Sequence, residues 1–302
     1  MFRSVGLAHI ARQEDGTSAG VWGLYALKSA FQPIFAFRDR QLRVAAYEGL
    51  LRPFRNGQPA SPAAFFSSVP ETDRLHVETL ARTLHLLNAG ACLDAAADIF
   101  VNFDPSFFTE LRIADGALRD MRLVLHEAQL EPRRIVCELT EQKSGSEATL
   151  KAFVHALRRH GYRIAVDDYG ADGSDMKRIG DLRPDIVKFD AHWVGRLMDC
   201  EPGIELLSSM AGDFRSRGIA VVFEGIEDGR QLEIAERCGA SMVQGFALAR
   251  PEFARAGLAE SCGAGGLRRA PAGSDVLPGI DGTLSPEMHI QARKHAFGRR
   301  KG

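Results

Sequence analysis

The sequence predicts an α/β fold, and within that class a modified TIM-like (β/α)8 barrel with an antiparallel first strand pair. Three observations support this prediction. Short β-branched or aromatic runs alternate with helical patterns along the chain. These runs are apolar on both faces, as in a parallel sheet covered by helices. The first two runs are joined only by RDRQ, which is too short for a parallel crossover, so they are expected to pair antiparallel.

The expected strands and helices follow in order along the chain. The strands are FQPIFAF at 31–37, RVAAYEGLL at 43–51, DIFVNF at 98–103, RIVCELT at 134–140, RIAVDD at 163–168, DIVKFD at 185–190, AVVFEG at 220–225 and MVQGF at 242–246. The helices are HVETLARTLHLLNAG at 76–90, ALRDMRLVLHEAQL at 117–130, SEATLKAFVHALRRHG at 146–161, IELLSSMAGDFRSRG at 204–218 and GRQLEIAERCGA at 229–240. Several of these helices end beside a glycine, which is a common C-terminal stop signal.

The ends of the chain differ in composition from its middle. Residues 1–22 are mixed and contain Gly and Ser, so we expect a poorly ordered lead-in. Residues 23–256 are expected to form the barrel domain. Residues 257–302 are rich in Gly, Ala and Pro and end in a basic stretch, which is typical of a flexible, solvated tail.

The overall composition excludes several classes of protein. Hydrophobic residues make up 45% of the chain and charged residues 25%, which is ordinary for a soluble globular protein. The net charge of −1 gives no general attraction to DNA, RNA or an anionic membrane. The five cysteines are scattered without a C-x-x-C pair, which favours reduced thiols over disulfides or a zinc site. With no apolar run long enough for a membrane span or a signal peptide, a cytoplasmic location is expected.

Polar residues stand near the carboxyl end of seven successive expected strands, where barrel enzymes build their active sites. They are Glu48, Asn102, Glu138, the pair Asp167-Asp168, Lys188, Glu224 and Gln244. Five of these residues are carboxylates, and only one is a cation. Their mutual repulsion requires counterions, and an all-oxygen ligand set favours Mg²⁺ or Mn²⁺. Two such ions side by side are a standard device for phosphodiester hydrolysis.

The chain resembles the EAL-domain family, bacterial phosphodiesterases that cleave cyclic di-GMP, over roughly residues 24–254. The motifs FQPIF, YEGLLR, VNF, CELTE, VDDYG, DIVKFD, FEGIED and VQGFALARP carry the resemblance, in this order. It implies a modified (β/α)8 barrel and a homodimer. It also implies hydrolysis of cyclic di-GMP to linear pGpG by water that two Mg²⁺ or Mn²⁺ ions activate.

The resemblance also assigns roles to individual residues. The metal ligands would be Glu48, Asn102, Glu138, Asp167 and Asp168, and the catalytic residues Lys188, Glu224 and Glu227. The substrate would be bound by Gln32, Leu51, Arg52 and Gln244, and Glu141 would anchor the loop after the aspartate pair.

Two departures from the family pattern leave alternatives open. Gly49 stands where the signature usually has alanine, which should affect packing more than chemistry. The loop at 169–176 carries Asp172 and Asp175 in place of small or aromatic residues. The main alternative is a catalytically weak or inactive EAL-type protein that acts as a cyclic di-GMP receptor or a protein-interaction module. A second alternative is a barrel hydrolase or lyase that acts on another phosphate ester. Regulation would come from dimerisation, the tails or a separate regulatory protein.

Overall fold

The computed structural model describes residues 9–39, 41–104, 111–140, 147–171 and 176–263. Its strands are β1 (Ile10–Arg12), β2 (Ser18–Trp22), β3 (Tyr25–Arg38), β4 (Gln41–Arg55), β5 (Gln58–Pro59), β6 (Asp98–Phe103), β7 (Ile135–Thr140), β8 (Arg163–Tyr169), β9 (Ile186–Phe189), β10 (Ala220–Phe223), β11 (Met242–Val243) and β12 (Glu252–Phe253). Its helices are α1 (Pro62–Ser68), α2 (Arg74–Cys92), α3 (Leu111–Glu127), α4 (Glu147–Arg159), α5 (Met176–Leu182), α6 (Ala191–Met198), α7 (Glu201–Ser216), α8 (Gly229–Cys238) and α9 (Leu258–Gly263), with short 3₁₀ turns at Glu71–Asp73 and Pro132–Arg134.

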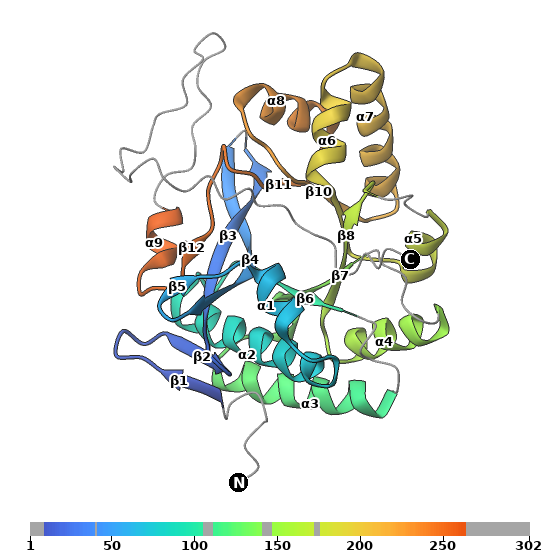
Figure 1. Ribbon diagram of the computed structural model, residues 1–302. Coiled ribbons are helices and arrows are strands. Elements are labelled where there is room, and N and C mark those ends of the chain that lie inside the picture. Colours follow the sequence, from blue (N-terminus) through green and yellow to red (C-terminus); the bar gives the residue numbers. More distant parts are fainter. Residues whose placement is uncertain (1–8, 40, 105–110, 141–146, 172–175, 264–302) are drawn as a thin grey trace.

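Eight of these strands close into a barrel surrounded by helices (Figure 1). Around the ring the order is β3, β4, β6, β7, β8, β9, β10 and β11, and β11 pairs again with β3. All neighbours in the ring are parallel except those of β3, which runs antiparallel to both β4 and β11. The predicted fold class and its antiparallel first pair are therefore confirmed.

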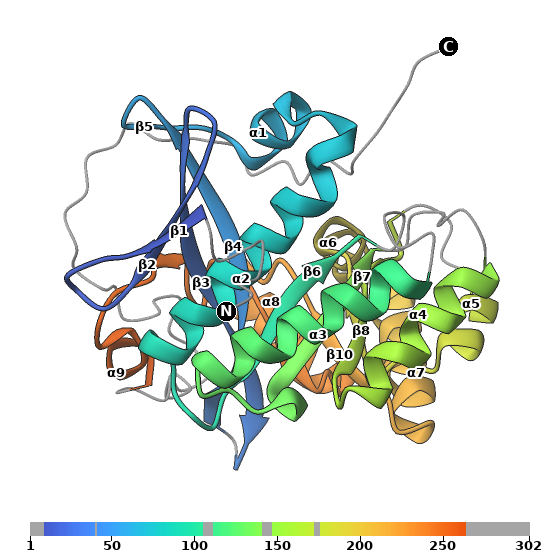
Figure 2. The same cartoon turned by 90° about the horizontal axis from the view of Figure 1, so that it is seen from below.

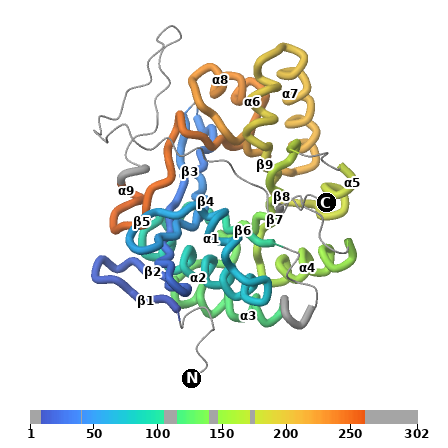
Figure 3. The backbone as a smooth tube through the Cα atoms, viewed as in Figure 1, coloured from blue at the N-terminus to red at the C-terminus, as the bar shows by residue number. Residues whose placement is uncertain are grey.

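The strand β3 is much longer than predicted and has several partners along its outer edge. That edge pairs in turn with β11, β12 and β2. The strands β1 and β2 form an antiparallel hairpin that lengthens the sheet beside β3 (Figure 3). The expected lead-in at 1–22 is thus ordered over residues 10–22, because this hairpin packs on α2, where Asn88 binds the backbone of Ser18. Of the expected tail, residues 264–302 lie outside the described residues.

The inside of the barrel is filled by an apolar layer to which seven strands contribute. It consists of Ile34, Ala46, Phe100, Val136, Ala165, Ile186 and Val222. Because side chains alternate along a strand, the next inward position lies two residues closer to the mouth. Those next positions are Gln32, Glu48, Asn102, Glu138, Asp167, Lys188 and Glu224. The packed apolar layer therefore forms a floor, and the polar residues predicted from the sequence form the layer above it.

The five predicted helices are present with shifted ends, and shorter helices that were not predicted fill the gaps. The helix α6 is one of these, and Asp190 caps its N-terminus, where Asp190 Oδ1 accepts a hydrogen bond from the backbone N–H of Trp193. Within the described part of the chain, none of the helices combines the length and the apolar character that crossing a lipid bilayer would require.

Candidate active site

Lys188 stands at the centre of the barrel mouth, surrounded by carboxylates from four other strands or strand ends. Its Nζ lies 2.5 Å from Glu138 Oε1, 2.7 Å from Glu224 Oε1, 3.2 Å from Asp167 Oδ1 and 3.5 Å from Glu48 Oε2. All five residues are buried. When every group is ionised, four negative charges face one positive charge. The structure therefore brings the predicted cluster together with a large excess of negative charge.

Burial and charge act together on the ionisation of this cluster. Burial raises the pKa of Glu138 well above its usual value, and the neighbouring carboxylates Glu48 and Asp167 raise it further, although Lys188 opposes this. For Lys188 itself, burial acts to lower the pKa, but the surrounding carboxylates outweigh burial and raise the pKa well above its ordinary value. Lys188 is thus held as a cation, while Glu138 resists ionisation unless more positive charge arrives.

Two glutamines complete the inner layer. Gln244 donates a hydrogen bond from Nε2 to Glu48 Oε2 at 2.8 Å, which fixes the orientation of that carboxylate. Gln32 is the direct cross-strand partner of Glu48, and its Nε2 donates to the carbonyl oxygen of Ala249 at 3.2 Å. Glu48 on β4 is therefore flanked by Gln32 of β3 and by Gln244, which directly follows β11.

A second group of carboxylates lies beside Lys188. Oxygen atoms of Asp167, Asp168 and Glu224 all lie within 4.8 Å of one another. Neighbouring residues in a regular strand point to opposite faces, but the pairing of β8 with β9 shifts register between Val166 and Tyr169. Asp168 also adopts a left-handed backbone conformation, with φ of 56°, which Asp tolerates better than most residues. This irregularity lets both carboxylates of the Asp pair reach one site.

The residues present fit hard divalent cations. The donors are carboxylate oxygens, which Mg²⁺, Mn²⁺ and Ca²⁺ prefer. The buried Glu138 Oε2 has no hydrogen-bond donor among the described residues, and a buried carboxylate oxygen without a partner is costly. Asn102 is the register partner of Glu138 on the adjacent strand, and Asn102 is exposed. A cation between these side chains would satisfy both the charge and the unpaired oxygen.

The remaining site residues predicted from the sequence differ in burial and in the direction of their side chains. Arg52 is half-buried on β4, where burial lowers its pKa and the charge of Glu48 opposes that shift. Glu227 is exposed in the loop before α8, where its backbone N–H donates to Gln231. Leu51 packs its side chain in an apolar cluster on the side of β4 that faces α1 and α2, away from the barrel interior. Glu141 lies outside the described residues, as do residues 172–175 of the variant loop.

A buried polar chain behind the site was not predicted. Ser29 Oγ lies 2.8 Å from His85 Nδ1 and accepts a hydrogen bond from Asn88 Nδ2 at 3.0 Å. His85 also packs against Gly49, where an added Cβ would lie 3.1 Å from the imidazole Cγ. The sequence signal was the presence of His85 and Asn88, three residues apart, on the otherwise apolar second half of α2 (LHLLNAGAC). The variant glycine of the signature thus makes room for a buried histidine.

We expect Gly49→Ala to lower the free energy of unfolding by about 1–3 kcal/mol, because the new methyl group overpacks this contact. The rate of any reaction at the mouth should change only modestly, since Glu48 is unaltered. Urea unfolding of Gly49→Ala, His85→Ala and the double variant measures the coupling between the two positions. The double variant should lose less stability than the sum of the two single variants, because His85→Ala makes room for the new methyl group. A hundredfold rise in activity for Gly49→Ala would contradict this expectation.

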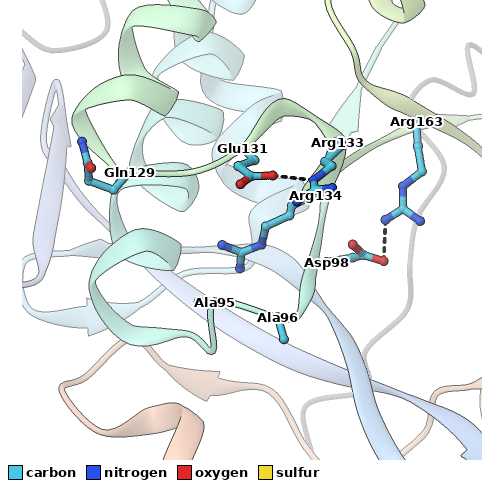
Figure 4. A pocket seen from close by; sticks show the side chains of 8 residues that line it. All are labelled: Ala95, Ala96, Asp98, Gln129, Glu131, Arg133, Arg134 and Arg163. Carbon is cyan, nitrogen blue, oxygen red and sulfur yellow. Dashed lines mark hydrogen bonds and ion pairs between the residues drawn. The ribbon is translucent and has the colours of Figure 1, made fainter.

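The opposite end of the barrel contains a hollow of about 450 Å³, lined by three arginines and two carboxylates (Figure 4). Arg133 pairs with Glu131, and Arg163 pairs with Asp98. Arg134 donates to the carbonyl oxygens of Ala97 and Asp94. Both carboxylates of this hollow are therefore paired with an arginine, and its charge excess is a single positive charge, in contrast to the excess of negative charge at the mouth.

Comparison with known protein families shows which family this chain belongs to. Residues 25–251 match the model of the EAL domain. The chain belongs to the EAL-domain family. Among curated EAL-domain relatives, the uncharacterized EAL-domain containing protein YkuI of Bacillus subtilis (strain 168) is 31% identical over 230 residues, which is 73% of this chain and 54% of YkuI. The cyclic di-GMP phosphodiesterase RocR of Pseudomonas aeruginosa is 27% identical over 196 residues, 63% of this chain and 49% of RocR.

Solved EAL structures support the fold. The structure of Bacillus subtilis YkuI, in complex with substrate c-di-GMP and calcium, matches with a TM-score of 0.64 and 29% identity, over 75% of this chain and 56% of that one. A manganese and cyclic di-GMP complex of Klebsiella pneumoniae BlrP1 matches with a TM-score of 0.69 and 24% identity, over 83% and 60%. This chain spans about half or less of the length of the curated EAL relatives that it matches.

Proposed function

We propose that this chain is a metal-dependent phosphodiesterase that hydrolyses cyclic di-GMP to linear pGpG. The observation that carries the proposal is the buried ring of carboxylates around Lys188, together with the adjoining group of Asp167, Asp168 and Glu224. Relatives that are named as cyclic di-GMP phosphodiesterases support the choice of substrate. The proposal retains the homodimer that the family resemblance implies and the cytoplasmic location that the sequence analysis expects.

The ligands for two Mg²⁺ or Mn²⁺ ions would come from five residues. Glu48, Asn102, Glu138 and Asp167 would hold the first ion, and Asp167 and Asp168 the second. When bound, the two ions would neutralise charge on the phosphate and lower the pKa of a coordinated water. Carboxylates that burial keeps from ionising, such as Glu138, would lose their protons as the ions arrive.

The side chains around the ions would position the substrate and handle the proton. Glu224 lies beside both Lys188 and the Asp pair, so its carboxylate would accept the proton from the attacking water. Lys188, held as an ammonium, would donate hydrogen bonds from Nζ to that water or to the scissile phosphate. Glu227, on the loop after Glu224, would support this region.

The substrate would be held mainly by the β3–β4 side of the mouth. Arg52 would grip a phosphate with its fork of donors, and Gln32 would lie near a guanine. Gln244 would keep Glu48 in the orientation that its hydrogen bond fixes. Because the Leu51 side chain faces the helices, only the backbone of Leu51 would be available to a substrate.

Removal of divalent metal provides the test of this function. With Mg²⁺ or Mn²⁺, the purified protein should convert cyclic di-GMP to pGpG, as followed by chromatography. Chelation should abolish the conversion, and added metal should restore it, because the charge of the mouth is unbalanced without cations. Turnover that survives full chelation would contradict the metal assignment. Tight binding with no product under any metal would instead support the receptor alternative.

A further inference from the structure

One side of the β3–β4 pair continues from the metal-ligand layer out beyond the barrel mouth. The last pair of β4 with β6 is Glu48 with Phe100, yet β4 runs on to Arg55, paired with β3 throughout. Figure 2 shows the two long strands passing beyond β6 toward β5 and α1. Alternation places Arg52 and Phe54 on the same side of this ribbon as Glu48. The other side carries Leu27 and Leu51, which pack toward α1 and α2.

Two cations stand directly opposite each other on this mouth-facing side. Lys28 and Arg52 are cross-strand partners in the register of β3 and β4. Like charges in this position repel each other and destabilise the sheet. Within the described part of the chain, neither forms an ion pair with a carboxylate, although Glu48 acts on Arg52 and Asp15 acts on Lys28 from a greater distance. An anion held between the two side chains would remove the repulsion, and a phosphate of a substrate bound at the mouth is an anion of that kind.

Two aromatic rings lie next to this pair of cations. Phe253 of β12 is the direct partner of Ala30 on β3, so it shares the mouth-facing side. Its ring centroid lies 5.9 Å from that of Phe54, at an interplanar angle of 44°. Lys28 Nζ lies 5.3 Å from the centroid of Phe54. Phe253 remains 48% exposed, and such an exposed ring offers a face on which a nucleobase can stack.

We propose that Lys28, Phe54 and Phe253 form an additional substrate-binding wall that takes the distal phosphate and a guanine base of the cyclic dinucleotide. This inference rests on the proposed function, since it names further contacts for the same substrate. The order along the ribbon supports it: the carboxylate Glu48 lies at the metal site, the cations Arg52 and Lys28 follow, and Phe54 comes last. Phe253, paired with Ala30, joins the ribbon between Glu48 and the cations, and its ring reaches that of Phe54. At about 3.3 Å per residue, Phe54 lies about 20 Å along β4 from Glu48, so the Phe54 end of the wall contacts the part of the substrate farthest from the cleaved bond.

The wall is tested with Lys28→Ala and Phe253→Ala, each on an exposed side chain whose loss should leave the fold intact. Leu24→Ala, at a side chain that is 70% exposed near the β2–β3 turn, is the matched control. For cyclic di-GMP, both wall variants should raise KM about tenfold, as loss of one phosphate contact does for Lys28→Ala and loss of one base-stacking contact for Phe253→Ala, while kcat changes less than about twofold. Each wall variant should lose at least five times more of its kcat/KM on cyclic di-GMP than on bis(p-nitrophenyl) phosphate, because the latter has no base and no second phosphate. Leu24→Ala should do neither.

Equal losses of kcat/KM on the two substrates, or an unchanged KM for cyclic di-GMP, would overturn the proposed wall. If the wild-type protein hydrolyses neither substrate, the proposed function fails, and the wall is then judged by calorimetric binding of cyclic di-GMP with Ca²⁺. A roughly tenfold weaker Kd in both wall variants would support the wall even then. An unchanged Kd, or the absence of binding to the wild type, would overturn it.

Discussion

Lys188→Met is expected to destabilise the metal-free protein by about 3–5 kcal/mol, the usual cost of removing one partner from a buried ionic cluster. Four buried carboxylates would lose the only cation that forms ion pairs with them among the described residues. Methionine keeps much of the volume, so packing changes little. Divalent metal should stabilise the variant more than the wild type, because added positive charge replaces the lost ammonium. Urea unfolding with EDTA and with Mn²⁺ measures both effects.

Lys151→Met is the matched control for this experiment. Lys151 Nζ lies 3.0 Å from Asp181 Oδ2, but both side chains are partly exposed. Loss of such a surface pair should cost at most about 1 kcal/mol, and metal should not change that difference. If Lys188→Met unfolded at the same urea concentration as Lys151→Met, the strong charge coupling inferred for the mouth would be wrong.

Glu48→Gln is expected to reduce hydrolysis of cyclic di-GMP by at least about a thousandfold, or about 4 kcal/mol of transition-state stabilisation. The amide keeps the shape of the side chain and can still accept the hydrogen bond from Gln244. It removes the charge that the first ion of the proposed metal pair would require. Initial rates by chromatography, together with calorimetric binding of Mn²⁺, should show weaker metal binding alongside the lost activity. Folding should be retained, since one negative charge fewer relieves the repulsion in the mouth.

Glu131→Gln serves as the comparison, because Glu131 is an exposed carboxylate at the other end of the barrel. Its activity and metal binding should match those of the wild type. Undiminished turnover in Glu48→Gln would contradict the assignment of Glu48 as a metal ligand. The ring of carboxylates around Lys188 would then need a purely structural explanation.

The inner layer of the site could be predicted from sequence because two periodic signals coincide there. Each barrel strand places a small or apolar residue on the floor and a polar residue two positions nearer the mouth, as with Val136 and Glu138. The same alternation turns the Leu51 side chain away from the mouth, because Leu51 is an odd number of residues from Glu48 and faces the helices. The parity of the strand is thus a stronger guide to side-chain direction than the motif itself.

Features that depend on distant pairing were not visible in the sequence. The hairpin at 10–22 has no strong apolar pattern and is held by contacts with β3 and α2. The β3–β4 ribbon is longer than its apolar run because its outer part is half exposed and carries Lys28 and Arg52. Phe253 comes beside Phe54 only through the pairing of β12 with β3. Local propensity could not reveal contacts made across such separations.

The closure of the barrel through β3 also sets the order in which the protein can become functional. The hydrogen bond between Gln244 and Glu48 joins residues 196 positions apart, and β11 meets β3 only after every other barrel strand has been made. Contacts at such long sequence separation give slow folding, since the entropy of closing the chain is lost before the contact forms. During synthesis the carboxylates of the early strands therefore exist without their final neighbours. The capacity to hold metal is expected to arise late and abruptly, when the last strand joins the first.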